Sequence, residues 1–412
     1  MIPQGYKQTE IGVIPEDWEI KYLDEFGDVI SGGTPSTSIK DYWDGDIAWC
    51  TPSDITATKG KYISKTARTI TGKGLQNSAA CILPPESILL CTRATIGELK
   101  LSKVPMSTNQ GFKNLRSNGT ANTGYLYYLL QTKKKDMLEL AIGSTFLEIS
   151  KKALCSIALQ TPFFDEQKRI AEALSDVDSM ISSLEKLIAK KKSVKQGAMQ
   201  ELLTGKKRLP GFDGEWKHCY LSQLGIFIKG SGISRDESNS GTLLAVRYGE
   251  LYTKHNNYIT KFYSHISEDV ANDAKRIYYG DILFAASGET KEEIGKCAAI
   301  VSNEEVYAGG DILIFRPFND LNPLFMGTVL NMPEAQKQRA EKGQGDAVVH
   351  IHADDLGKMS VYIPKFEEQT AIASVLSDMD NEIEALEQKL TKTRQVKQGM
   401  MQQLMTGKIR LV

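Results

Sequence analysis

The chain has 412 residues, enough for two or three domains, and its 50 Lys and Arg residues balance 51 Asp and Glu residues to a net charge of −1. Its composition, 41% hydrophobic and 25% charged, is typical of a globular protein, and no apolar run approaches the roughly 18 residues that a membrane helix needs. The balanced charge excludes a uniformly basic nucleic-acid coat but not a local basic patch.

The cysteines are scattered and none forms a CxxC pair, so the sequence indicates neither a zinc site nor a disulfide framework. The amino-terminal stretch MIPQGYKQTE lacks the apolar segment of a signal peptide. We therefore expect a cytoplasmic protein.

The first predicted domain covers residues 1–160. Its opening stretch, 1–18, is rich in turn residues and ends at Trp18. Short strand-like runs such as 87–92 follow, separated by Gly and Pro turns, and a helix is predicted at about 123–139. Because strands and helices mix without regular βαβ alternation, the predicted fold class is α+β.

Basic side chains in this domain are candidates for DNA contact. From Lys59 to Lys73 the chain carries five basic residues and no acidic one, among Ser and Thr that can bond phosphate oxygens. Arg93 lies in a turn after an apolar strand, from which a guanidinium could reach a guanine edge. For each single residue, a solvated surface position is the simpler alternative. The candidates are Lys59, Lys61, Arg68, Lys73, Arg93, Thr95 and Lys113.

Residues 161–209 predict a long helix. After Pro162, apolar residues from Ile170 to Ile188 recur at alternating steps of four and three, which is the a/d seam of a coiled coil. The stretch ends in Thr-Gly-Lys, where Gly205 is a natural helix stop. A helix of roughly 35–40 residues, about 50–60 Å long, is expected.

The second predicted domain covers residues 210–361. Its opening, 210–216, resembles 1–18 in leading through Pro and Gly to an acidic residue and a tryptophan. Strands are predicted at 281–286, 297–301 and 311–316, and a helix at about 323–342. The candidate DNA contacts here are interleaved with acidic residues, and they are Arg235, Arg247, Lys275, Arg276 and Lys291.

Residues 362–412 repeat the long helix. The stretch 364–411 aligns with 162–209 without a gap, and roughly half of the positions are identical, which is the mark of an internal repeat. Two matching seams in one chain favour an antiparallel coiled coil over two helices buried in separate cores. The residues expected to pack the helices are Ile170, Leu174, Ile181, Leu184, Ile188, Ile372, Leu376, Ile383, Leu386 and Leu390.

The repeat also predicts how the chain closes. The first helix leads from Arg208 directly into 210–216, whereas the second ends at Val412. If 12–18 follows residue 412 in space, the order becomes domain, helix, domain, helix and back to the start. We therefore expect a pseudo-two-fold, cyclic organisation.

Catalytic signatures are missing from the sequence. Gly72-Lys73 and Gly205-Lys206 lack the earlier glycine of a phosphate-binding loop. His350 and His352 could share one face of a strand, but no third metal ligand lies nearby in the sequence. We expect no catalytic group, no metal and no cofactor in this chain.

Several motifs occur in an order that resembles one family. They are 5–18 (GYKQTEIGVIPEDW), 31–35 (SGGTP), 42–46 (YWDGD), Trp49 with 51–55 (TPSDI), 108–112 (TNQGF), 143–146 (GSTF) with 149–151 (ISK), and the duplicated helix. Together they resemble the specificity subunits of type I restriction–modification enzymes, and the resemblance covers the whole chain. The second domain departs from the pattern: 286–295 is longer and more acidic than 92–97, and 344–347 only loosely matches 143–146.

The resemblance implies two target-recognition domains joined by two conserved helices. Each domain would read one half of a bipartite double-stranded DNA target, and the helices would set the gap. Two methylation subunits, which bind S-adenosylmethionine, would dock on the helices, and restriction/translocase subunits would join them. The alternative is a coiled-coil scaffold or regulator whose heads bind proteins. An autonomous methyltransferase would need a cofactor pocket that the sequence does not offer.

Overall fold

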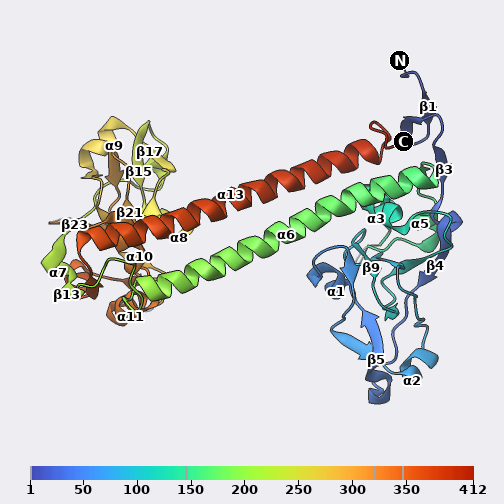
Figure 1. Ribbon diagram of the computed structural model, residues 1–412, viewed down its shortest axis with the longest axis horizontal. Coiled ribbons are helices and arrows are strands. Elements are labelled where there is room, and N and C mark those ends of the chain that lie inside the picture. The colour runs from blue at the N-terminus through green and yellow to red at the C-terminus, as the bar shows by residue number, and fades with distance from the viewer. Residues whose placement is uncertain (1, 144–146, 319–320, 346–347) are drawn as a thin grey trace. The chain divides into compact units, whose positions relative to one another are not determined.

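The computed structural model describes residues 2–143, 147–318, 321–345 and 348–412 (Figure 1). The chain forms two compact units, one of residues 1–188 and 386–412, the other of residues 189–385. Each unit combines a globular head with a part of both long helices. We call the heads head one (2–161) and head two (205–363).

The two long helices are α6 (Phe164–Leu202) and α13 (Phe366–Leu404), each of 39 residues, as the apolar seam predicted. Both carry two acidic residues in the first turn, where the positive end of the helix dipole favours them. Both are followed by a glycine with positive φ, Gly205 at 68° and Gly407 at 69°, which is the usual way to end a helix.

Head one contains a five-stranded sheet and a three-stranded sheet. The larger sheet has the order β4 (Gly27–Ser31), β11 (Lys113–Ser117), β8 (Ile88–Leu90), β9 (Leu99–Ser102), β6 (Tyr62–Ile63), and the smaller β10 (Met106–Thr108), β5 (Trp43–Cys50), β7 (Arg68–Ile70). Two further antiparallel pairs are the hairpin of β1 (Tyr6–Thr9) with β2 (Gly12–Pro15), and the long-range pair of β3 (Glu19–Lys21) with β12 (Leu159–Thr161). The helices are η1 (Leu23–Phe26), η2 (Lys40–Tyr42), α1 (Pro52–Ala57), α2 (Gly72–Gln76), α3 (Thr123–Thr132), α4 (Lys134–Glu139) and α5 (Lys151–Cys155).

Head two contains a five-stranded sheet and a four-stranded sheet. The larger has the order β14 (Gly225–Lys229), β23 (Ile312–Pro317), β19 (Ile282–Ala285), β21 (Cys297–Ile300), β16 (Tyr258–Ile259), and the smaller β17 (Ser264–Ile266), β15 (Leu243–Val246), β22 (Val306–Ala308), β18 (Lys275–Ile277). The remaining pairs are β13 (Lys217–Tyr220) with β25 (Ser360–Ile363), and β20 (Ser287–Gly288) with β24 (Val349–His350). The helices are α7 (Leu221–Leu224), η3 (Asp236–Ser238), α8 (Tyr248–Thr253), α9 (Glu268–Asp273), α10 (Pro323–Val329), α11 (Pro333–Lys342) and α12 (Ala353–Gly357).

The five-stranded sheets of the two heads share one topology, although the sequences of the heads barely match. At one edge of each five-stranded sheet, the strand earliest in the sequence (β4 or β14) pairs antiparallel with the strand latest in the sequence (β11 or β23). At the opposite edge, β6 or β16 pairs parallel with its neighbour. The predicted α+β class is therefore confirmed. The helix predicted at 123–139 is interrupted at Lys133, and the one at 323–342 is divided before Pro333, which cannot donate a helical hydrogen bond.

The long helices pack against each other in an antiparallel sense. In the first unit, Asp178 pairs with Lys397 and Glu185 with Arg394, each at 2.6 Å. A step toward the carboxyl end of α6 is thus matched by a step toward the amino end of α13. The same direction holds in the second unit, where Lys191 pairs with Glu382 at 2.6 Å and Lys195 with Asp380. The predicted antiparallel pairing is confirmed.

The apolar seam of each helix has two kinds of neighbour. In the first unit, part of the seam of α6 packs directly against α13. The cluster there consists of the buried Leu184, Ile188 and Leu390, with Ile181 and Leu386 packed beside them. Toward the helix starts the seam enters the heads: Ile170 and Leu174 belong to the core of head one, whereas Ile372 and Leu376 belong to the core of head two. Ile383 is also buried. Each head is therefore continuous with its helices through one apolar core.

The cyclic organisation predicted from the repeat is confirmed within the first unit. The guanidinium of Arg410, beyond α13, donates to Glu166 at 2.7 Å and to both oxygens of Asp17 at 2.7 and 2.9 Å. The Trp18 ring lies 3.3 Å from where a Cβ on Gly407 would be. In the second unit Arg208 pairs with Glu368, and the Trp216 ring lies 3.4 Å from where a Cβ on Gly205 would be. The same junction thus occurs in both units. In the second unit the helix end leads directly along the chain into the tryptophan, whereas in the first unit the helix end and the tryptophan lie at opposite ends of the sequence.

Candidate nucleic-acid interface

The basic run of head one lies in the connections around β6, β7 and α2. Lys59 is exposed in the loop after α1, and Lys73 is exposed on α2 with Asp41 3.7 Å away. Arg68, on β7, lies flat over Trp43, with its guanidinium carbon 3.6 Å from the ring centroid. This stacking leaves the edge of the guanidinium plane available for hydrogen bonding. These side chains can present positive charge to a phosphate backbone.

Two further candidates of head one are engaged inside the protein. The Lys61 amine donates to Ser175 of α6 at 3.2 Å and lies 4.9 Å from the centroid of Tyr128. Burial lowers the pKa of Lys61, while nearby Asp178 opposes that shift. The Lys113 side chain is only 11% exposed and lies 3.8 Å from Glu148. Both amines help to join parts of the head.

Arg93 and Thr95 lie in the connection between β8 and β9. The Arg93 backbone bridges to Glu148, and its side chain is half-buried. Ala94 between them has φ of 62°, a left-handed conformation that turns the chain sharply. The Thr95 hydroxyl lies beside Cys91, whose pKa burial raises to about 12. The Thr95 hydroxyl is enclosed and makes no hydrogen bond to another described residue by its geometry. Most of the 143–146 element and part of 344–347 lie outside the described residues.

In head two, Arg235 and Arg247 line one cavity of about 590 Å³. Its walls also include four glycines, Tyr248 and two acidic residues. Lys275 and Arg276 are exposed on β18, with Arg276 3.0 Å from Glu305, and Lys291 is exposed in the loop after β20. Of the five candidates in this head, the structure therefore places Arg235 and Arg247 in one cavity, whereas Lys275, Arg276 and Lys291 lie outside it.

Arg247 is supported by a buried polar group. Its Nε lies 3.8 Å from Glu250, a residue that is 6% exposed. Glu250 accepts a hydrogen bond from Ser264 and lies 3.8 Å from the buried His255. Arg247 Nε itself has no hydrogen-bond acceptor among the described residues. Glu250 therefore orients the guanidinium by charge from the buried side, and the Arg247 side chain is 30% exposed.

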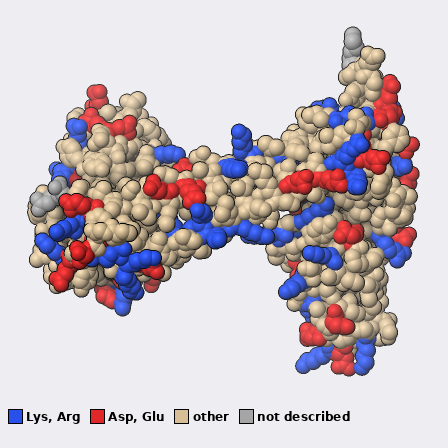
Figure 2. Space-filling model, in the orientation of Figure 1, with Lys and Arg blue, Asp and Glu red and all other residues tan. Residues whose placement is uncertain are grey.

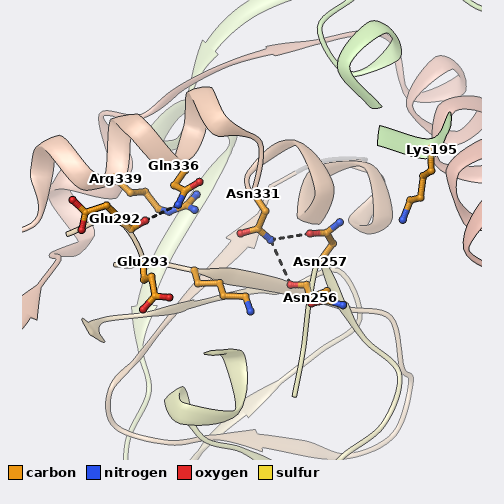
Figure 3. Close-up of a pocket in the computed structure, with 9 residues that line it drawn as sticks. Lys195, Asn256, Asn257, Glu292, Glu293, Asn331, Gln336 and Arg339 are labelled. Carbon is orange, nitrogen blue, oxygen red and sulfur yellow. Dashed lines mark hydrogen bonds between the residues drawn. The ribbon is translucent and has the colours of Figure 1, made fainter. Parts of the chain in front are cut away.

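A second cavity of head two, of about 440 Å³, is lined by α11, the Asn256–Asn257 loop and Lys195 of α6 (Figure 3). Asn331 donates to Asn257 Oδ1 at 3.2 Å and to the Cys297 carbonyl at 2.7 Å. The buried Arg339 donates to the Ile294 carbonyl at 3.2 Å and to that of Leu330 at the end of α10. These side chains are used to fix loops to the core, so we assign this cavity a packing role.

Figure 2 shows Lys and Arg interspersed with Asp and Glu on the visible face of both heads. Such a mixture agrees with the net charge of −1 and favours contacts through local basic groups over a single broad basic surface. Sequence reasoning missed Tyr248 and the support of Arg247 by Glu250, because only folding brings residues 232, 247 and 310 to one cavity. Among the described residues no group of three or more His, Cys, Asp or Glu could hold a metal ion, and no helix is long and apolar enough to cross a membrane.

Comparison with known proteins gives matches over both halves of the chain. Residues 15–196 and 214–394 each match the family described as type I restriction modification DNA specificity domain. The MjaIX specificity subunit of Methanocaldococcus jannaschii is 40% identical over 183 residues, which are 44% of this chain and 42% of that protein. The chain thus covers less than half of that relative. The MjaVIII specificity subunit of the same organism is 23% identical over 99% of this chain and 96% of its own.

Solved structures show the same fold. The type I restriction–modification S subunit of M. genitalium has a TM-score of 0.59 at 15% identity, covering 98% of this chain and 99% of that one. The HsdS subunit of Thermoanaerobacter tengcongensis has a TM-score of 0.54 at 16% identity, covering 99% and 100%. The fold likeness and the two family matches agree on one assignment. The chain belongs to the family of type I restriction–modification DNA specificity subunits.

Proposed function

We propose that this chain selects the DNA sequence for a type I restriction–modification complex, with each head reading one half of a bipartite target. The observation that carries the proposal is the repetition of one five-stranded sheet in two heads with differing side chains. Two readers held by one spacer give a specificity that is the product of two half-sites. As a specificity subunit the chain is non-catalytic and carries no cofactor of its own.

The proposed DNA contacts are the accessible basic groups of the heads. In head one they are Lys59, Arg68, Lys73 and Arg93, and in head two Arg235, Arg247, Lys275, Arg276 and Lys291. Lysines contact phosphates as point charges, whereas an arginine can also read a guanine edge with two hydrogen bonds. Lys61 and Lys113 are engaged inside the first unit and the Thr95 hydroxyl is enclosed there, so the proposal gives them a supporting role.

The partners follow from the same proposal. Two methylation subunits, each binding S-adenosylmethionine, dock on α6 and α13, and the restriction/translocase subunits join that assembly. The pseudo-symmetric junctions at Arg208 and Arg410 support two equivalent docking positions, because a repeated surface can bind two copies of one partner.

The test is the pattern of methylated adenine across the genome with the gene intact and deleted. We expect a split motif of two short half-sites to lose methylation on deletion. Unchanged methylation while the methylation subunits are expressed would contradict the proposal and favour a protein-binding scaffold. The two functions also differ in salt dependence: DNA binding through several phosphates weakens steeply with salt, whereas a protein-binding head shows a shallow dependence.

A further inference from the structure

The cavity of about 590 Å³ in head two is built where three loops meet. One wall is Gly232–Ile233 after β14, another is the start of α8 at Tyr248, and the third is Gly309–Gly310 before β23. Its volume falls in the usual range for a small-molecule site, roughly 300–1,000 Å³. The cavity is therefore large enough for a nucleobase.

The backbone of this cavity is held in an unusual conformation. Ile233 has φ of 60°, which is rare for a β-branched residue. The Gly310 amide donates to the Gly232 carbonyl at 3.1 Å, which joins two of the walls. A Cβ on Gly310 would meet only that carbonyl oxygen, at 3.7 Å, so the glycines leave open space there. The loops are braced around a space that their side chains do not fill.

The polar groups of the cavity suit a base better than a phosphate. Two cations, Arg235 and Arg247, are balanced by Glu237 and Asp311, so the lining has no net positive charge to attract an isolated anion. It does offer both donors and acceptors, which is what the hydrogen-bonding edge of a base requires. The Tyr248 side chain is exposed at the lining, where an aromatic ring can stack on a base.

Arg247 is the group prepared to read that edge. Its Nε is buried and lacks an acceptor among the described residues, while Glu250 holds the guanidinium from 3.8 Å. The enclosed Nε faces Glu250, whereas the side chain as a whole is 30% exposed and lines the cavity. A guanidinium that is already held in place can offer its terminal amino groups to a base with little reorganisation. Glu250 is itself fixed by Ser264, which makes it a positioning residue.

We propose that this cavity is a base-reading pocket that receives the hydrogen-bonding edge of one nucleobase of the half-site bound by head two, with Arg247 reading the edge and Tyr248 stacking. The inference rests on the proposed function and assigns it a site. Head one differs at the corresponding place, because Thr34 donates to Gln110 across the equivalent loops and a Cβ on Gly33 would lie 2.2 Å from the Ala79 backbone. The pocket should therefore act on one half-site only.

The experiment uses the full chain assembled with its methylation subunits, S-adenosylmethionine and a random-sequence DNA library, with methylated adenines read by sequencing. The variants are Arg247→Ala and Arg247→Lys. The control is Lys358→Ala, which removes a cation paired with Asp355 three residues away, as Arg247 is paired with Glu250, but outside the cavity. A thermal melt of each variant checks folding.

We expect both Arg247 variants to lose preference at one position of one half-site by about 5- to 150-fold, because a bidentate base contact is lost even when the charge is kept. The other half-site and the control should match the wild type. An unchanged motif, or a uniform loss at all sequences that Arg247→Lys restores, would overturn the pocket. A wild-type chain that directs no split motif would instead contradict the proposed function.

Discussion

Removal of the Arg410 side chain should destabilise the first unit strongly. Arg410 donates to Glu166, whose side chain is only 3% exposed and which also accepts from the Trp18 indole at 3.1 Å. Breaking a buried ion pair from one side costs about 3–5 kcal/mol, because the remaining charge is left without its partner. Since the Arg410 side chain is itself 23% exposed, we expect Arg410→Ala to lower the free energy of unfolding by about 3 kcal/mol.

The assay is urea unfolding of the full chain followed by tryptophan fluorescence, with the transition of each unit fitted separately. Arg394→Ala is the matched control. It breaks a pair at 2.6 Å, close to the 2.7 Å of Arg410 and Glu166, but its side chains are 56% and 34% exposed, so it should cost less than about 1 kcal/mol. Adding Glu166→Gln to Arg410→Ala should recover part of the loss, because the buried charge is then removed. A loss for Arg410→Ala no larger than for Arg394→Ala would refute the reasoning.

Four further outcomes are expected. Inserting seven residues after both Ala189 and Thr391 adds one heptad to each helix, which keeps the seam in register and lengthens the spacer by about 10 Å. The gap between the two half-sites should then grow by about three base pairs of roughly 3.4 Å each. An unchanged gap in methylation mapping would show that the helices do not set it. Lys59→Ala and Lys73→Ala should each lower the slope of log affinity against log salt by about 1, as measured by DNA binding in a salt series; unchanged slopes would mean that neither amine contacts phosphate. Arg93→Ala should reduce discrimination at one half-site by about 1–3 kcal/mol in the same methylation assay, whereas an equal loss on all sequences would make Arg93 a phosphate contact. Arg410 lowers the pKa of Asp17 below its ordinary 3.8. The stabilisation from this pair is therefore fully present above pH 3.8 and is lost as the pH falls through the lower pKa of the folded state. The free energy of unfolding, measured against pH, should show this loss in acid for the wild type and less of it for Arg410→Ala.

The sequence determined the features that depend on local periodicity and on repetition. The apolar residues from Ile170 to Ile188 recur at steps of four and three, and such residues share one face only if the chain is helical. Both 39-residue helices could therefore be predicted from the sequence, together with their ends. The copy of the 210–216 entry at 12–18 was enough to predict closure of the chain, because the same residues form the same junction. The order of weak motifs along the chain indicated the family.

Only the tertiary structure decided which candidate side chains face solvent and what surrounds them. Lys59 and Lys61 are two residues apart, yet one is exposed and the other is covered by Tyr128 and α6, because strand residues and their connections meet partners more than a hundred positions away. The shared five-stranded sheet was only partly evident from the sequence, in the likeness of 87–90 to 281–284 and of 110–116 to 310–316, since a sheet requires burial and pairing at each position but not a particular apolar residue. The cavity around Arg247 exists because loops at 232, 248 and 310 converge, and no local pattern encodes that convergence.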